Sequence, residues 1–433
     1  MKNQLLGLLL VCSSVIGYGQ TLDLETCLQM ADTANLQIRN ARLAVASDEK
    51  QVAAYLTARL PKITATGDYK YNAIIPGQVL PAQMFGGPAG TYQTVQFGVP
   101  YNLSNTLQLT QILFNPQVNY GITALKLNHQ IVEIQQKMTE RDIHEQVAST
   151  FFTLQAINKQ YAFVTANIAS MDKLIANMEA MQKEGMVVGT EVDKLKINRL
   201  TLMNSQQTLS ATKEQLEGLF RILIGMDATA PLQLVTDEMV EQTVLVDKET
   251  IVRPELEMLE MQRKLNVEER KGTNMAYLPS LSLYGAYNYT YNMKPADDFR
   301  TGIESAMIGL RLDWTLFDGL EKMQKQKANR INLEKIENQQ ELLTRQLDVQ
   351  LTNAKKQIEI QSNSLMIAKE QVTLAQRVFD QSTAQFNQGT ISSNDLIIAE
   401  NNLREAQTQV VSSYVNLRQA EIAYLKAIGY TGK

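Results

Sequence analysis

The sequence predicts a mainly α-helical protein with membrane β-strands, in which one structural unit occurs twice. The prediction comes from long stretches without glycine or proline, landmarks that recur in both halves, and short stretches of alternating polarity. The longest stretch, residues 320–388, lies between Gly319 and Gly389, and residues 390–428 form a second one. At about 1.5 Å per residue, the first stretch would form a helix of roughly 105 Å. A long helix, a turn at Gly389 and a returning helix make one hairpin.

Residues 1–19 are expected to be a secretory signal peptide. A lysine precedes a mostly apolar stretch too short to span a membrane, and glycines stand at the −3 and −1 positions of a cleavage site. The mature protein would start at Gln20 or Thr21. A lipid on Cys12 is the weaker alternative, because the bulky Val11 stands where a lipoprotein signal has a small residue.

Composition limits the remaining function classes. The formal net charge is −4, so no basic excess points to nucleic acid as a partner. Cys27 is the one cysteine after the signal peptide, which leaves no intramolecular disulfide. No apolar stretch of about 20 residues follows residue 20, so no helix is expected to cross a bilayer. The exported chain would therefore meet a membrane through strands or an amphipathic face.

The two halves share their landmarks in the same order and at nearly the same intervals. Phe114 precedes Gly185 by almost the same distance along the chain as Phe317 precedes Gly389, and a further glycine follows each turn at an identical interval. Internal repeats of this kind have to be recognised before a fold is predicted, because each repeat is one structural unit. We expect a first repeat over 20–225, a linker over 226–252 and a second repeat over 253–433. The recurring landmarks are Leu60-Pro61 and Leu278-Pro279, Leu113-Phe114 and Leu316-Phe317, Gly185 and Gly389, and Gly225 and Gly429.

The helices carry apolar rows at heptad spacing. Large residues on one row and small residues on the next allow knobs-into-holes packing. The leucine zipper of a transcription factor is disfavoured, because no basic region precedes the leucine row and a signal peptide stands in front. In the first copy, the long stretch without glycine or proline is 122–184. The rows are Leu195, Leu202, Leu209, Leu216 and Leu223 in the first copy, and Leu396, Leu403, Val410, Leu417 and Tyr424 beside Ala399, Ala406, Ser413 and Ala420 in the second.

Four stretches alternate with a period of two and predict amphipathic strands. Strands of about ten residues with one apolar face suit an outer-membrane barrel, and the aromatic side chains suit its interfacial girdles. A soluble sheet with one buried face is the alternative, which the signal peptide and the duplication disfavour. The apolar faces include Ile63, Ala65 and Gly67; Leu107, Leu109 and Leu113; Leu281, Leu283 and Gly285; and Ala306, Ile308, Leu310, Leu312 and Leu316, with membrane-facing aromatics Tyr69, Tyr71, Tyr287, Tyr289, Tyr291 and Trp314.

Four strands are too few to close a barrel, since the smallest bacterial barrels use about eight. An open edge in lipid leaves unpaired backbone groups that cost several kcal/mol each. If these strands lie in a membrane, several copies must therefore pool them.

Together these features resemble the TolC family of outer-membrane efflux proteins over nearly all of residues 21–430. The Leu-Pro-Ser-Leu-Ser-Leu strand start at 278–283, the Leu-Phe-Asp-Gly strand end at 316–319 and the Arg-Pro-Glu-Leu helix start at 253–256 carry the resemblance. The resemblance implies a homotrimer with a 12-stranded outer-membrane β-barrel, continued by a long periplasmic α-helical barrel with an equatorial region at the linker. It implies that the protein lies in the outer membrane of a Gram-negative bacterium. The implied partners are outer-membrane lipid, a periplasmic adaptor (membrane fusion) protein and an inner-membrane RND or ABC pump.

The resemblance also implies two kinds of site. Family hairpin tips meet the adaptor, which assigns adaptor docking to Gly185, Met186, Gly389 and Thr390, although the family's leading valine is absent from both tips. Shortly after the second tip glycine, the family has an aspartate that constricts the closed tunnel. Here these gate positions are Asp395, its first-copy equivalent Glu191, and Ile398, where a second family aspartate is missing. The alternative for Asp395 is an exposed aspartate in the first turn of a helix, where it interacts favourably with the helix dipole.

We expect no enzyme, no cofactor and no metal. His129 and His144 lie about four turns apart on one predicted helix, too far for one ion, and no residue qualifies as a nucleophile with a base. Methionines near the first tip suit packing better than a copper path. The expected function is efflux of small molecules through the outer membrane. The exit duct of a type I protein secretion system is an alternative, as is a soluble periplasmic coiled-coil adaptor.

Overall fold

The computed structural model describes residues 21–235 and 253–429. The predicted signal peptide, Cys12, Gln20 and residues 236–252 of the predicted linker lie outside the described residues. The chain divides into two compact units. We call residues 21–45, 133–235, 253–258 and 340–429 the helical unit, and residues 46–132 and 259–339 the sheet unit.

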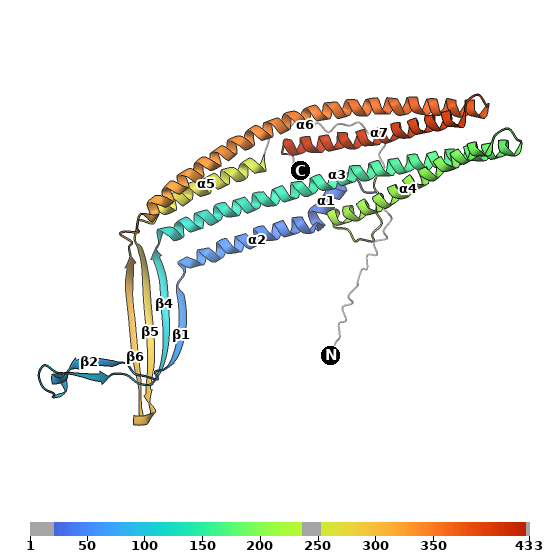
Figure 1. The fold of residues 1–433 in the computed structure, drawn as a ribbon. Helices are drawn as coiled ribbons and strands as arrows, with labels where there is room; N and C mark the ends of the chain where they lie inside the picture. The colour runs from blue at the N-terminus through green and yellow to red at the C-terminus, as the bar shows by residue number, and fades with distance from the viewer. Residues whose placement is uncertain (1–20, 236–252, 430–433) are drawn as a thin grey trace, which may run out of the picture. The chain divides into compact units, whose positions relative to one another are not determined.

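Two long helical hairpins run through the chain (Figure 1). Helix α3 (Pro116–Lys183) has 68 residues and is followed by α4 (Gly189–Ile224). Helix α6 (Glu321–Asn387) has 67 residues and is followed by α7 (Ser393–Ala427). Both ends of α6 agree closely with the predicted stretch. The mainly helical class is thus confirmed.

Helix α3 begins earlier than the predicted run, which started at residue 122. Pro116 stands at its first position, where a missing N–H costs nothing. Gly121 lies inside the helix, although glycine there costs about 1 kcal/mol relative to alanine. The hydroxyl of Tyr55 occupies the space that a Cβ at this position would need. Close packing in the sheet unit therefore explains the glycine that made the sequence look non-helical.

The core of the helical unit consists of three clusters of buried side chains. The first joins α3, α6 and α7, the second lies next to the two hairpin turns, and the third joins α3 and α4 to α1 (Leu24–Ala34) and α2 (Leu36–Leu56). The predicted rows on α7 are all buried, and on α4 Leu195, Leu202 and Leu223 are buried while Leu209 and Leu216 are half-buried. Met171 and Met178 belong to the second cluster, as packing predicted.

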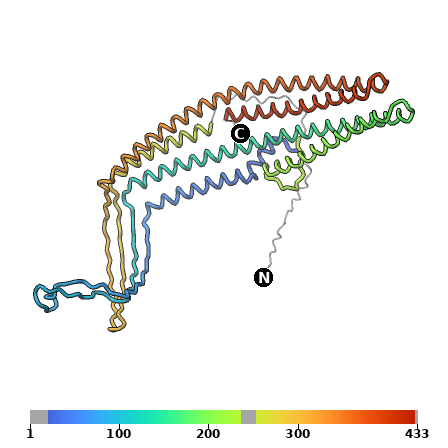
Figure 2. The backbone as a smooth tube through the Cα atoms, viewed as in Figure 1, coloured from blue at the N-terminus to red at the C-terminus, as the bar shows by residue number. Residues whose placement is uncertain are grey.

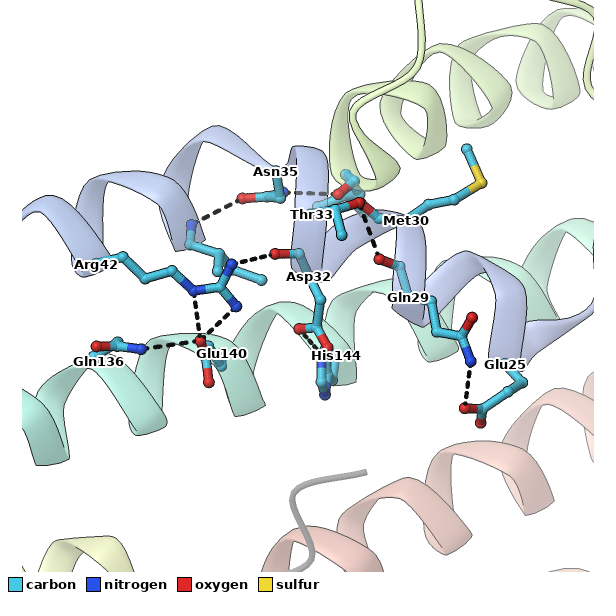
Figure 3. A network of polar contacts seen from close by, with 12 residues as sticks. Glu25, Gln29, Met30, Asp32, Thr33, Asn35, Arg42, Gln136, Glu140 and His144 are labelled. Atoms are coloured by element: carbon cyan, nitrogen blue, oxygen red, sulfur yellow. Dashed lines mark hydrogen bonds and ion pairs between the residues drawn. The ribbon is translucent and has the colours of Figure 1, made fainter. Parts of the chain in front are cut away.

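Helices α1 and α2 are separated by Asn35, which ties the break to α4. Its side-chain oxygen accepts from the N–H groups of Gln37 and Ile38, and its amide nitrogen donates to the carbonyl of Leu223 at 2.7 Å. Around this break, Asp32 lies 2.7 Å from Nε2 of His144. Figure 3 shows this network, which also includes the ion pair of Arg42 with Glu140 at 2.9 Å.

The sheet unit contains a four-stranded antiparallel sheet in the order β1-β4-β5-β6 (Figure 1). Strand β1 is Lys62–Tyr71, β4 is Tyr101–Phe114, β5 is Ser280–Lys294 and β6 is Phe299–Asp313. Helix α5 (Pro254–Met275) precedes β5. Four strands at the predicted places are confirmed.

Three details of the strands differ from the prediction. A bulge between Ile112 and Phe114 brings Phe114 opposite Leu281, so Leu113 is the extra residue. Strand β6 ends at Asp313, so Trp314 and Leu316 both lie beyond the end of the strand. The connection between β1 and β4, where no strand was expected from the sequence, contains a second sheet, in which β2 (Gly77–Pro81) pairs with β3 (Tyr92–Gln96). Alternation alone could locate neither the bulge nor a two-stranded sheet within a segment rich in glycine and proline.

The register places the expected side chains on common faces. Tyr69 pairs with Leu103, which pairs with Tyr291, so one face is aliphatic and aromatic from β1 to β5. On the opposite face Asn102 donates to Asn292 at 2.8 Å, and Asn288 donates to Thr106 at 2.7 Å. Side chains on the apolar face stay exposed in the single chain, among them Ile63, Tyr69, Tyr287, Ile308 and Leu310. In the part of the chain that the structure describes, no helix is both long and apolar enough to cross a membrane.

Candidate functional site

The first hairpin turn, residues 184–188, joins α3 to α4. Gly185 has φ +73°, the left-handed conformation that glycine adopts without strain. The N–H of Met186 donates to the carbonyl of Met181 at 2.9 Å, which closes the helix end. The side chains of Met186 and Val188 are 70% and 66% exposed. The turn thus presents two apolar side chains on a fixed backbone.

The second turn, residues 388–392, repeats this geometry. Gly389 has φ +72°, and Thr390 donates from both its N–H (3.0 Å) and its hydroxyl (2.9 Å) to the carbonyl of Gln385. Val187 of the first turn and Ile391 of the second pack against the same buried cluster. The two turns are therefore held at the same end of the helical unit (Figure 2).

Asp395 caps α7. Its Oδ2 accepts from the N–H (3.1 Å) and the hydroxyl (2.7 Å) of Ser392, whose hydroxyl in turn receives the N–H of Asp395. This reciprocal arrangement is a capping box. The hydrogen bonds from Ser392 hold the pKa of the exposed Asp395 carboxyl below its usual value. The structure thus gives Asp395 a structural role at the helix start.

Glu191 connects the starts of α4 and α7. It accepts from the hydroxyl of Ser393, which is buried, and lies 2.8 Å from the ammonium of Lys194. Asp395 and Glu191 thus bind different partners, and Ile398, the third predicted gate residue, is half exposed. The predicted gate positions all lie within the first turns of two adjacent helices.

A row of buried polar side chains on α7 was missed by the sequence reasoning. Its members follow each other at heptad spacing, beside the leucine row, and we call them the polar ladder: Ser393, Glu400, Gln407, Tyr414 and Glu421. Each of the middle three bonds to the other hairpin. Asn198 donates to Glu400 (3.0 Å), Asn167 donates to Gln407 (2.9 Å), and the Tyr414 hydroxyl donates to Gln155 (3.0 Å). The heptad spacing of polar residues was the signal that could have found it.

At the far end of the polar ladder lies a buried ion pair. Arg418 lies 2.7 Å from Glu421, and its guanidinium stands over the rings of Phe152 and Tyr414. Burial raises the pKa of the Glu421 carboxyl despite this neighbour. The ladder joins the hairpins by hydrogen bonds rather than by apolar contacts alone.

The predicted membrane aromatics lie in the sheet unit. Tyr69 and Tyr71 stack on Tyr101 with ring centroids 6.4 and 4.9 Å apart. The three predicted tyrosines of β5, Tyr287, Tyr289 and Tyr291, share the same face through the register. The indole of Trp314 donates to the carbonyl of Tyr277 at 3.1 Å, beyond the end of β6.

Over residues 21–235 and 253–429, no group of three or more His, Cys, Asp or Glu side chains could hold a metal. The two histidines pair with different partners, His129 with Asp48 and His144 with Asp32. Cys27 is fully buried, and burial raises the pKa of its thiol to about 12.

Comparisons with known proteins agree with this architecture. Residues 245–430 match the family model described as Outer membrane efflux protein, whereas no curated protein sequence matches the chain. The structure of CusC has a TM-score of 0.74 and 14% identity, over 94% of this chain and 91% of that one. The structure of VceC from Vibrio cholerae has a TM-score of 0.70 and 12% identity, over 94% of this chain and 96% of that one. The structure of the open MtrE channel from Neisseria gonorrhoeae has a TM-score of 0.72 and 14% identity, over 95% of this chain and 89% of that one. At these identities the structures show a shared fold.

Proposed function

Because residues 245–430 match the family model described as Outer membrane efflux protein, we propose that the chain is the outer-membrane exit duct of a tripartite efflux system. In this proposal three copies form one 12-stranded barrel in the outer membrane, continued by a helical barrel in the periplasm. Small molecules pass from an inner-membrane pump of the RND or ABC type, through a periplasmic adaptor, into the duct.

The four-stranded sheet carries the proposal. Strands β1 and β6 are its edges, each paired on one side within the described residues. Its apolar face is exposed, while its opposite face is a hydrogen-bonded polar surface. A lipid-facing and a water-facing side suit a barrel wall, and unpaired edges in lipid cost several kcal/mol per group. Pooling the strands of three copies removes both edges and gives twelve strands.

Exposed apolar side chains in the helical unit support assembly in the same way. Among the described residues, helices α3 and α7 expose no large apolar side chain except that of Ile398. Helices α4 and α6 expose many such side chains. On α6 several recur at heptad spacing, as in a coiled-coil seam: Leu342 and Val349, then Ile360, Ile367 and Leu374, while α4 exposes Ile197, Leu200, Met203, Leu219 and Ile222.

The two exposed rows match in their distance from the turns. Leu200 follows Gly185 by the same number of positions by which Leu374 precedes Gly389. Since the two turns are held at one end of the helical unit, Leu200 and Leu374 lie at about the same level. In the trimer, α4 of one copy packs on α6 of the next, with Leu200 facing Leu374. The similar lengths of α3 and α6, and of α4 and α7, agree with two equivalent halves.

The gate and the docking surface belong to the same proposal. Threefold symmetry brings three Asp395 carboxylates toward one axis, where a ring of negative charge favours cations and resists anions. Glu191 and Ile398 complete the constriction. The turns around Gly185, Met186, Gly389 and Thr390 form the adaptor-docking surface, and in the first turn the apolar side chains of Met186 and Val188 are exposed in the described chain.

Pore formation by purified protein tests the function. Detergent-solubilised protein is expected to migrate as a trimer and to insert discrete ion-conducting pores into planar bilayers. Leu200→Lys places a charge in the proposed helix seam and should abolish trimers and pores. Ser412→Lys, at an exposed polar position of α7 and outside the proposed seam, is the control and should keep both. Wild-type protein that purifies as a monomer without detergent would contradict the proposal and favour a soluble adaptor.

A further inference from the structure

The connection between β1 and β4 has an unusual composition. No charged residue occurs from Tyr71 to Leu125, whereas charged residues make up 20% of the whole chain. Residues 72–100 of this stretch form the second sheet and its turn, and we call them the arm. Figure 1 shows the arm extending from the end of β1 that is opposite to α2.

The arm is a folded element. Its strands β2 and β3 pair from Gly77 to Pro81, and a 3-10 turn (Ala82–Phe85) follows. At the tip, the N–H of Ala82 donates to Thr91 and the N–H of Gly87 donates to Ala82, both at 2.9 Å. At the base, the N–H of Asn72 donates to Pro100 at 2.7 Å, and its side chain donates to Val99 at 3.1 Å.

The surface of the arm is apolar and uncovered. Met84 is 70% exposed and Tyr92 is 73% exposed; Ile74, Val79, Phe85 and Phe97 are exposed as well. Each arm strand pairs only with the other among the described residues, so both outer edges have free backbone groups. A two-stranded sheet is marginally stable alone in water and needs further packing. The arm therefore has the properties of a contact element.

The neighbouring connection, between β5 and β6, is built differently. Four charged residues lie within it or at the adjoining strand ends, Lys294, Asp297, Asp298 and Arg300, and Lys294 pairs with Asp297. These charges suit a turn that faces water. Two turns at the same end of one sheet thus have opposite chemistry, which argues that the arm meets something other than solvent.

Three features of the arm identify its partner as another copy of the chain. It starts at β1, the free edge that meets the next copy in the proposed trimer, so its base is continuous with that interface. It has no charge, so identical arms do not repel each other. It lacks the lysines and arginines that recognise anionic lipid headgroups.

The length of the arm is sufficient for a contact with a neighbouring copy. Strand β2 of the arm (Gly77–Pro81) alone spans about 17 Å at about 3.3 Å per residue. A barrel of twelve strands at about 4.8 Å spacing and about 40° tilt has a radius of about 12 Å. An arm rooted on its rim is thus long enough to reach a neighbouring copy.

We propose that the arm is an intersubunit clasp, in which Val79, Met84 and Tyr92 pack on an adjacent copy at the outer end of the barrel. The proposal rests on the proposed function, because it requires the trimer. It adds a contact surface that neither the strands nor the helices supply.

Photo-cross-linking in intact cells tests the clasp. The probe p-benzoylphenylalanine replaces Met84 or Tyr92 on the arm and, as a reference for the trimer, Leu374 on α6. The clasp predicts a light-dependent covalent dimer of the chain from both arm positions. Adducts with another protein or with lipid, or none, while Leu374 gives the dimer, would overturn the clasp and leave the proposed function standing. No dimer from any position would overturn both.

Charge substitution gives a second readout with a matched control. Tyr92→Lys is expected to lower the temperature at which the trimer dissociates on a gel, because three like charges are brought into the contact. Ala296→Lys adds the same charge to the β5–β6 turn and should leave that temperature unchanged. Equal dissociation temperatures for the two variants would count against the clasp.

Discussion

Replacing Gly225 by alanine should destabilise the protein more than the same change at either hairpin turn. Gly185, Gly225 and Gly389 have φ of +73°, +70° and +72°, so the backbone penalty is the same for all three. A left-handed conformation costs a non-glycine residue about 1–2 kcal/mol. Their surroundings differ, and this difference is what the comparison measures.

At Gly225 an added Cβ would collide with α1. It would stand 2.7 Å from the carbonyl carbon and 2.8 Å from the carbonyl oxygen of Ala34, and nearer still to its methyl group. Backbone atoms must then move, and overpacking of this kind adds about 1–3 kcal/mol. The hydrogen bond from Asn35 to Leu223 lies in the displaced region. At Gly185 and Gly389 nothing lies within 4 Å of the Cβ position.

The expected costs are therefore about 2–5 kcal/mol for Gly225→Ala and about 1–2 kcal/mol for each turn variant. With an unfolding entropy of about 2.1 cal/mol/K per residue, 1 kcal/mol shifts the melting temperature of a 433-residue chain by about 1 °C. Circular dichroism melting measures the shift, and hydrogen exchange of α1 shows whether it is local. Equal shifts for all three variants would refute the packing argument.

Three further predictions concern the tips and the core. Asp395→Ala should raise single-channel conductance and relieve block by polyvalent cations; since hydrogen bonds lower the pKa of this carboxyl, its capping contribution is present at neutral pH and lost only as the pH falls below the usual carboxyl value of about 3.8. Unchanged conductance and block would exclude Asp395 from the gate. Met186→Asp should reduce co-purification of the adaptor about tenfold, or about 1.4 kcal/mol, with unchanged pore conductance; equal recovery would remove Met186 from the docking surface. Cys27, buried with a pKa of about 12, should resist maleimide in the native protein and react after unfolding; rapid native labelling would show that α1 is not packed as described.

The sequence predicted most of the fold because long-range regularity was strong. Residues 320–388 have no helix breaker, and the helix ends are set by glycines with positive φ at the turns. The alternation around Tyr287 and Ile308 gave the faces of the strands, which the register confirms.

Local tertiary packing decided what the sequence could not predict. Gly121 looked like a helix boundary, but Tyr55 fills the space beside it. The break at Asn35 depends on the carbonyl group of Leu223, which is so distant in the sequence that no local pattern reports it. The partners of the polar ladder likewise come from the other hairpin. Sequence placed Asp395 at a helix start, and the structure adds its hydrogen-bonding partner, Ser392.

The trimeric duct is tested most directly by cross-linking between copies. A double variant with cysteines replacing Leu200 and Leu374 is expected to form covalent trimers on oxidation in the membrane, because each copy would present one cysteine to each neighbour. Each single variant should stay uncross-linked. Absence of covalent dimers and trimers from the double variant, together with a protein that stays monomeric and soluble without detergent, would contradict the account.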